Sequence, residues 1–201
     1  MKVQAMCMTV VVIALTAGLG HAAQESVAVD LIRRECSTCH GASGISVSPM
    51  FPNLAGQQAA YLEVQLKAFR DRSRADPHAQ AFMWGMAAQL TDSTIADIGA
   101  YFAAQPPAKG TPAGPAEIAA GSKIFEEGIA AQQVQPCQSC HMKNAEGNAV
   151  FPRLAGQHRS YLEKQLEVFA TGLRANAIMH EPAKNLSALQ ISQVAAFLSS
   201  R

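Results

Sequence analysis

The chain of 201 residues contains two copies of one pattern, and this internal repeat constrains its fold more than any other feature. The segment Phe51-Pro52-Asn53-Leu54-Ala55-Gly56-Gln57 recurs as Phe151-Pro152-Arg153-Leu154-Ala155-Gly156-Gln157, at an offset of 100 residues. The segment Tyr61-Leu62-Glu63-Val64-Gln65-Leu66 recurs in the same way as Tyr161-Leu162-Glu163-Lys164-Gln165-Leu166. A tandem duplication therefore predicts two similar domains of about 80–95 residues, each large enough to fold but with a small core.

Turn-forming and apolar stretches divide the chain into four predicted segments. Lys2 is followed by a short apolar run and then by small residues up to Ala23, which is the pattern of a secretory signal peptide. The segment from Gln105 to Pro115 holds four prolines and two glycines, which excludes a continuous helix. We expect a signal peptide over residues 1–23, a first domain over 24–105, a linker over 106–115 and a second domain over 116–201.

Apolar side chains recur at helical spacing in both copies. Leu62, Leu66 and Phe69 follow this spacing, and so do their counterparts in the second copy. Ser187 and Gln190 have the spacing of a capping box at the start of the last helix. Because no run alternates convincingly between apolar and polar residues, the sequence predicts an all-α fold.

Composition excludes two classes of protein and raises a question about the cores. A net charge of +1 with 15% charged and 49% hydrophobic residues lacks the basic excess of nucleic-acid-binding proteins and the polarity of disordered chains. Aromatic residues make up only 6% of the chain, which is few for two cores. Another bulky apolar group is therefore expected inside each domain.

A Cys-x-x-Cys-His motif in each copy identifies that group. Cys36, Cys39 and His40 form the first motif, and Cys137, Cys140 and His141 form the second. This motif is the attachment signature of c-type haem, because two thiols one helical turn apart can bond the two vinyl groups while the histidine reaches the iron. A four-cysteine zinc site or two thioredoxin-like pairs are the alternatives, but neither requires a histidine after both pairs. We predict two covalently bound haem c groups, held by Cys36, Cys39, Cys137 and Cys140, with His40 and His141 as iron ligands.

The ligand on the other face of each iron is predicted from the repeat. When the copies are aligned on Leu90 and Leu186, Met83 matches Met179, and this is the only column with methionine in both copies. Methionine pairs with histidine in electron-carrying haems, so Met83 and Met179 are the predicted axial ligands. Methionines that only fill core gaps are the structural alternative. The other candidate side chains are Met50, Met86, Met142, His78, His158 and His180, with Met86 and His180 next in rank.

Together these motifs resemble the dihaem cytochrome c4 family over essentially the whole chain after the predicted signal peptide. The resemblance implies two tandem class I cytochrome c domains, and it implies that the carbonyl groups of Pro52 and Pro152 orient His40 and His141. Family members usually carry glycine after the haem histidine. Gly41 follows that pattern, whereas Met142 departs from it.

Histidine and methionine together saturate the iron, which favours an electron carrier over an enzyme. The resemblance implies a periplasmic carrier that links a quinol-oxidising complex or a dehydrogenase to a terminal oxidase or reductase, with peripheral membrane association left open. One alternative is the dihaem subunit of a flavin-containing sulfide dehydrogenase. Another is a dihaem oxidoreductase that acts on peroxide or thiosulfate. Nothing in the composition predicts binding to nucleic acid.

The sequence does not assign a single role to two arginine and two tyrosine side chains. Arg74 and Arg174 occupy equivalent positions in the two copies, where a guanidinium can pair with a haem propionate or face solvent. Tyr61 and Tyr161 are expected to pack in the domains, with their hydroxyl groups in reach of a propionate.

Overall fold

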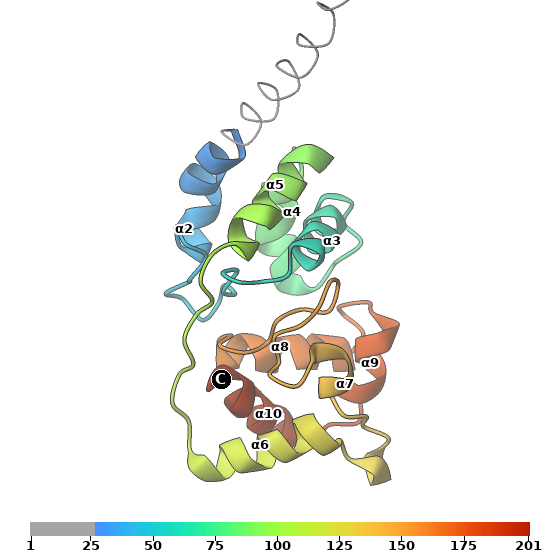
Figure 1. Cartoon of the computed structure of the whole chain (residues 1–201). Helices are drawn as coiled ribbons and strands as arrows, with labels where there is room; N and C mark the ends of the chain where they lie inside the picture. Colours follow the sequence, from blue (N-terminus) through green and yellow to red (C-terminus); the bar gives the residue numbers. More distant parts are fainter. Residues whose placement is uncertain (1–26) are drawn as a thin grey trace, which may run out of the picture.

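The structure of the protein, a computed structural model, describes residues 27–201. The predicted signal peptide and Cys7 lie outside these residues. Within the described part of the chain every regular element is helical, and only two isolated β-bridges occur, between Ile129 and Val134 and between Asn148 and Phe151. Two helical domains lie one above the other, joined by an extended segment along one side (Figure 1). The predicted all-α fold with two domains is confirmed.

In the first domain, the N-terminal helix leads directly into the first Cys-x-x-Cys-His motif. The chain is helical from residue 27, passes through a π-helical turn, η1 (Ile32–Cys36), and ends in α2 (Ser37–His40). The domain continues with α3 (Ala59–Arg70), a second π-helical turn η2 (Ala79–Met83), α4 (Trp84–Ala87) and α5 (Asp92–Ala103). α3 packs against α5, and the core between them and the N-terminal helix includes Ala28, Ile32, Leu62, Ile98 and Phe102.

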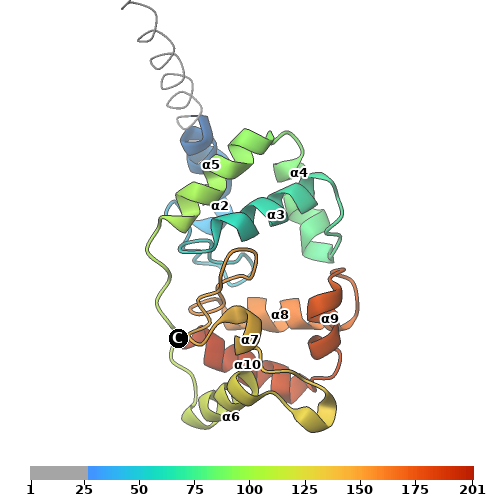
Figure 2. The ribbon, with the colours of Figure 1, turned by 45° about the vertical axis from the view of Figure 1, so that its right-hand side comes forward.

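The second domain repeats this plan. Its elements are α6 (Pro115–Glu127), a short 3₁₀ turn η3 (Ala130–Gln132), α7 (Gln138–His141), α8 (Arg159–Ala170), α9 (Ala177–Ala183) and α10 (Ala188–Ser199). α10 packs against both α6 and α8, as both views show (Figure 2). The Ser187 and Gln190 side chains form the predicted capping box at the start of α10.

The segment between α5 and α6 is extended and lies against both domains. The Thr111 backbone N–H donates to the Ser199 carbonyl oxygen at 2.7 Å. α6 begins at Pro115, the last residue of the predicted linker, because proline is well suited to the first position of a helix. None of the helices within residues 27–201 is both long and apolar enough to cross a bilayer.

The crossing of α6 and α10 depends on Gly121, and alanine at this position is expected to destabilise the protein. A Cβ atom at Gly121 collides with the Gln193 carbonyl oxygen and approaches the Phe197 Cβ to 2.8 Å. Overpacking of this kind costs about 1–3 kcal/mol. Chemical unfolding of the haem-loaded Gly121→Ala variant measures the loss.

A matched control is Gly85→Ala, because a Cβ atom at Gly85 in α4 meets nothing within 4 Å. This variant is expected to gain about 0.5–1 kcal/mol, since alanine restricts the unfolded chain and favours the helix. Equal unfolding midpoints for the two variants contradict the proposed close approach of α6 and α10.

Candidate haem sites

Each Cys-x-x-Cys-His motif forms one helical turn, α2 in the first domain and α7 in the second, with Cys36 and Cys137 as the N-cap residues. The two cysteines of each motif are therefore one turn apart, and the histidine ends the helix. All four thiols are free and half-buried. Burial raises the pKa of Cys36 and of Cys137 to about 11, so these thiols are neutral groups in apolar surroundings. This environment suits attachment to a hydrophobic macrocycle.

The histidine of each motif is buried and held by one hydrogen bond to a carbonyl group. His40 Nδ1 donates to the Pro52 oxygen at 2.9 Å, and His141 Nδ1 donates to the Pro152 oxygen at 3.0 Å. Because a carbonyl oxygen can only accept, the proton lies on Nδ1 and the Nε2 lone pair is left for a metal. Burial lowers the pKa of both histidines and favours the neutral form that ligates iron. The two hydrogen bonds expected from the resemblance are confirmed.

The predicted methionine ligands lie on short helical segments far from the histidines in sequence. Met83 ends η2 and packs against the cluster of Phe69, Ala79 and Ala87. Met179 lies in the first turn of α9, and its backbone N–H donates to the Asn176 side chain at 3.0 Å. Both methionines are half-buried. Their bonds to iron stay a prediction.

Several of the competing ligand candidates have other contacts. His158 Nε2 lies 3.1 Å from the Ser46 carbonyl oxygen, in the other domain. His180 Nδ1 donates to the Phe169 oxygen at 2.8 Å, which holds the ring against α8 and leaves its Nε2 lone pair available, as at His40 and His141. His180 therefore stays the alternative ligand in the second domain. Met50 and Met86 are 50% and 43% exposed, so they are less enclosed than Met83 or Met179. The rings of His78 and Phe82 form an edge-to-face pair, with their centroids 5.9 Å apart.

Met142 adopts a conformation that glycine accepts more easily. Its φ and ψ are 65° and 163°, close to the values of 77° and 151° at Gly41. A side chain in this region carries backbone strain. The backbone at Met142 therefore has nearly the same conformation as at Gly41, despite the departure from the family pattern.

The zinc alternative is wrong for the part of the chain that the structure describes. All four cysteines of the motifs belong to residues 27–201, and no three His, Cys, Asp or Glu side chains there come close enough to hold a metal ion. A four-cysteine site needs all four thiols at one point, whereas the duplicated motifs lie in separate domains (Figure 1).

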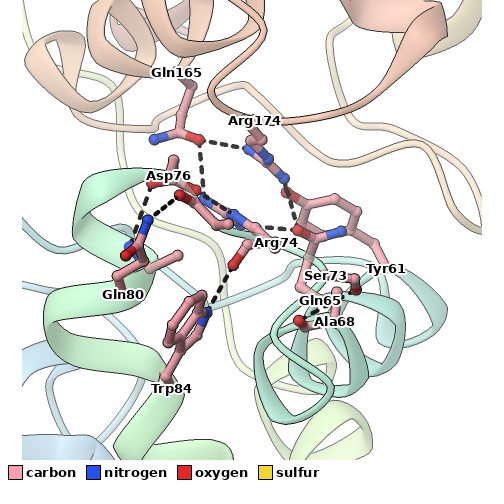
Figure 3. A network of polar contacts seen from close by, with 12 residues as sticks. Tyr61, Gln65, Ala68, Ser73, Arg74, Asp76, Gln80, Trp84, Gln165 and Arg174 are labelled. Carbon is pink, nitrogen blue, oxygen red and sulfur yellow. Dashed lines mark hydrogen bonds and ion pairs between the residues drawn. The ribbon is translucent and has the colours of Figure 1, made fainter.

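Arg74 and Arg174 are both buried, which excludes the alternative that they face solvent. Each guanidinium lies over the phenylalanine ring of its own domain, at 4.7 Å from Phe69 and 4.5 Å from Phe169. Figure 3 shows Arg174 and Gln165 of the second domain meeting Arg74, Gln65 and Tyr61 of the first. Their pairing with haem propionates stays a prediction.

The hydrogen bonds of this network cross between the domains in both directions. Arg74 donates to Gln65 at 2.8 Å and to Gln165 at 3.0 Å. Arg174 donates to Gln65 at 2.7 Å, and also to Gln165 and to the Tyr61 hydroxyl oxygen. The two halves differ in one respect, because Arg74 also forms an ion pair with the buried Asp76 at 2.9 Å. The second copy has Asn176 at the position of Asp76.

Beside this network, the duplicated Phe-Pro-x-Leu-Ala-Gly-Gln segments face each other. Gln57 bonds the backbone N–H and carbonyl oxygen of Arg153, and Gln157 does the same to Asn53. Each glutamine thus binds the same position of the other copy, which is the reciprocal pattern of a two-fold symmetric interface. The sequence analysis identified these glutamines as part of the repeat but missed their role at the interface.

Two helical domains, each with a Cys-x-x-Cys-His turn and a buried histidine oriented by a carbonyl group, define a c-type haem protein. Comparison with known proteins agrees, since the family model described as cytochrome c matches residues 29–105 and 118–201. The chain belongs to the cytochrome c family and, within it, to the dihaem cytochromes c4. It therefore carries two covalently bound haem c groups and transfers electrons.

Individual relatives support this placement over most of the chain. Cytochrome c4 of Pseudomonas aeruginosa is 37% identical over 90% of this chain and 90% of its own length. The solved structure of Acidithiobacillus ferrooxidans cytochrome c4 has a TM-score of 0.79 and 41% identity, covering 83% of this chain and 98% of that one. A thiosulfate dehydrogenase electron acceptor of Thiomonas intermedia is 41% identical over 83% of this chain and 78% of its own length.

Proposed function

We propose that the protein is a periplasmic electron carrier in which His40 and Met83 ligate one iron and His141 and Met179 ligate the other. Haem c supplies a reversible one-electron iron couple. The observation that carries the proposal is the buried, carbonyl-bonded histidine that ends each Cys-x-x-Cys-His turn. With methionine sulfur as the sixth ligand, neither iron keeps a position for a substrate, so the protein exchanges electrons with partner proteins.

The donor is a dehydrogenase or a quinol-oxidising complex, and the acceptor is a terminal oxidase or reductase. Similarity to a thiosulfate dehydrogenase electron acceptor supports the dehydrogenase as donor. A permanent role as the dihaem subunit of a flavin-containing dehydrogenase is the alternative. Isolation of the protein in a stable complex with a flavoprotein favours that alternative, and isolation of the free protein favours the carrier.

The carrier function is tested with the mature protein, exported and loaded with haem by a c-type maturation system. Pyridine haemochrome analysis is expected to return two covalent haems per chain. Carbon monoxide is expected to leave the spectrum of the reduced protein unchanged, because both irons are saturated. A thiosulfate dehydrogenase, added in catalytic amount with thiosulfate, is expected to reduce both haems.

Two results count against the proposal. Formation of a carbon monoxide complex by one haem of the native protein indicates a displaceable ligand and revives the oxidoreductase hypothesis. Oxidation of thiosulfate by the protein alone, with no dehydrogenase present, has the same consequence.

A further inference from the structure

The glutamine that ends each Phe-Pro-x-Leu-Ala-Gly-Gln segment binds the backbone of the other domain at two points. Gln57 Oε1 accepts from the Arg153 N–H at 2.7 Å, and Gln57 Nε2 donates to the Arg153 oxygen at 3.0 Å. Gln157 makes the corresponding bonds to Asn53, both at 2.9 Å. Both glutamines are 7% exposed, so water does not compete freely for these bonds.

The bound peptide groups are the same ones that orient the haem histidines. The Pro152 oxygen and the Arg153 N–H belong to one planar peptide unit, and its two ends point in opposite directions. His141 donates to the oxygen end, and Gln57 accepts from the N–H end. A continuous chain of hydrogen bonds thus runs from the imidazole of the second domain to a side chain of the first.

An equivalent chain of hydrogen bonds runs from the imidazole of the first domain to a side chain of the second. His40 donates to the Pro52 oxygen, and the N–H of the next residue, Asn53, donates to Gln157 of the second domain. Hydrogen bonds that share one peptide group polarise each other, so the Gln157 bond strengthens the carbonyl group as an acceptor. A stronger bond at Nδ1 makes the imidazole a more basic ligand.

A further hydrogen bond holds the side-chain amide of each glutamine in the orientation in which it binds the other domain. Gln57 Oε1 also accepts from the Gln58 N–H at 3.0 Å, and Gln157 Oε1 accepts from the His158 N–H at 3.0 Å. These bonds join each amide group to the start of α3 or α8. Both amide groups are therefore fixed by the helix of their own domain and act on the other.

We propose that Gln57 is a positioning residue for His141, and Gln157 for His40, so that each domain sets the basicity of the iron ligand in the other. The proposal rests on the assignment of these histidines as iron ligands in the proposed function. The basicity of the histidine ligand within each domain then depends on the interface between the two domains. Removal of Gln57 weakens the acceptor that His141 uses, makes that imidazole less basic and raises the reduction potential of the haem in the second domain.

The test uses the full chain with both haems bound and the variants Gln57→Leu and Gln157→Leu. Spectroelectrochemical titration resolves the two reduction steps, and Met83→Ala and Met179→Ala reference proteins assign each step to its domain. Gln57→Leu is expected to shift the second domain's step upward and to leave the first domain's step in place. Gln157→Leu is expected to do the reverse. The NMR chemical shifts of the histidine ring protons are expected to change in the same way, at His141 in Gln57→Leu and at His40 in Gln157→Leu.

A matched control is Gln58→Ala, which removes a bond across the same interface to the Glu146 oxygen but does not touch a histidine-bound peptide. It is expected to shift neither step. Gln57→Met keeps the side-chain length and replaces Gln57→Leu if the latter fails to fold. A shift confined to the domain that carries the mutation, or equal shifts of both steps, overturns the inference.

The same measurements distinguish a failure of this inference from a failure of the proposed function. If the parent protein shows methionine-ligated iron in both domains and the shifts are not crossed, only the cross-domain positioning fails. If the parent protein lacks histidine or methionine ligation, the proposed function fails first.

Discussion

Replacement of Met179 by alanine is expected to remove half of the methionine-to-ferric charge-transfer absorption of the oxidised protein while both haems stay covalently attached. Attachment depends on the Cys-x-x-Cys-His turns, which the substitution does not touch. Methionine as an axial ligand raises the reduction potential, so the potential of the affected haem is expected to fall. Met83→Ala is expected to remove the other half. An optical spectrum and a redox titration of each variant measure both effects.

Met86→Ala is the control for the first domain, because Met86 lies three residues after Met83 and is 43% exposed. It is expected to leave the absorption intact. His180→Ala serves the second domain, since His180 is adjacent to Met179 and is the alternative ligand there. Loss of half the absorption in Met86→Ala, with none lost in Met83→Ala, assigns the first ligand to Met86. A histidine-ligated iron gives no methionine absorption, so a second-domain haem ligated by His180 shows itself when Met179→Ala removes none of the absorption and His180→Ala shifts the haem spectrum and the reduction potential instead.

The fold was predictable because its signals are local. Leu62, Leu66 and Phe69 mark one face of α3 by their spacing alone, and the Ser187 and Gln190 capping box marks the start of α10. Prolines between the repeats predicted the extended connection in the same way. The haem-binding turns were predictable for a chemical reason, since few other sites need two thiols and an imidazole at this spacing.

The interface between the domains was not predictable, because it depends on which faces meet. The sequence left open whether Arg74 faces solvent or a haem propionate. It is buried, since Gln165 of the other domain completes its hydrogen bonds. The repeat of Gln57 as Gln157 carried no distinct signal, because common ancestry of the copies also explains identical residues. Only the pairing of the two copies shows that these glutamines bind backbone across the interface.

Removal of the Arg74 guanidinium is expected to cause the largest loss of stability among single substitutions at this interface. Arg74 Nε donates to Asp76 Oδ2 at 2.9 Å, and the Asp76 side chain is only 2% exposed. Loss of one partner of a buried ion pair leaves an uncompensated charge and costs about 3–5 kcal/mol. Arg74→Ala also removes the donor to Gln165, so the domains lose one bond across the interface. Denaturant unfolding of the haem-loaded variant measures the change.

Arg174→Ala is the matched comparison. Arg174 is as buried as Arg74 and also stacks on a phenylalanine ring, that of Phe169. Its hydrogen-bond partners are neutral side chains, namely Tyr61, Gln65 and Gln165. Arg174→Ala leaves no carboxylate side chain of the protein without its partner, and its cost is expected to be smaller than that of Arg74→Ala. The double variant Arg74→Ala, Asp76→Ala is expected to regain part of the stability lost by Arg74→Ala, since the stranded charge is removed with its partner. If both single variants lose the same stability and the double variant regains none, stacking and interface bonds dominate, and the asymmetry between Asp76 and Asn176 has no energetic consequence.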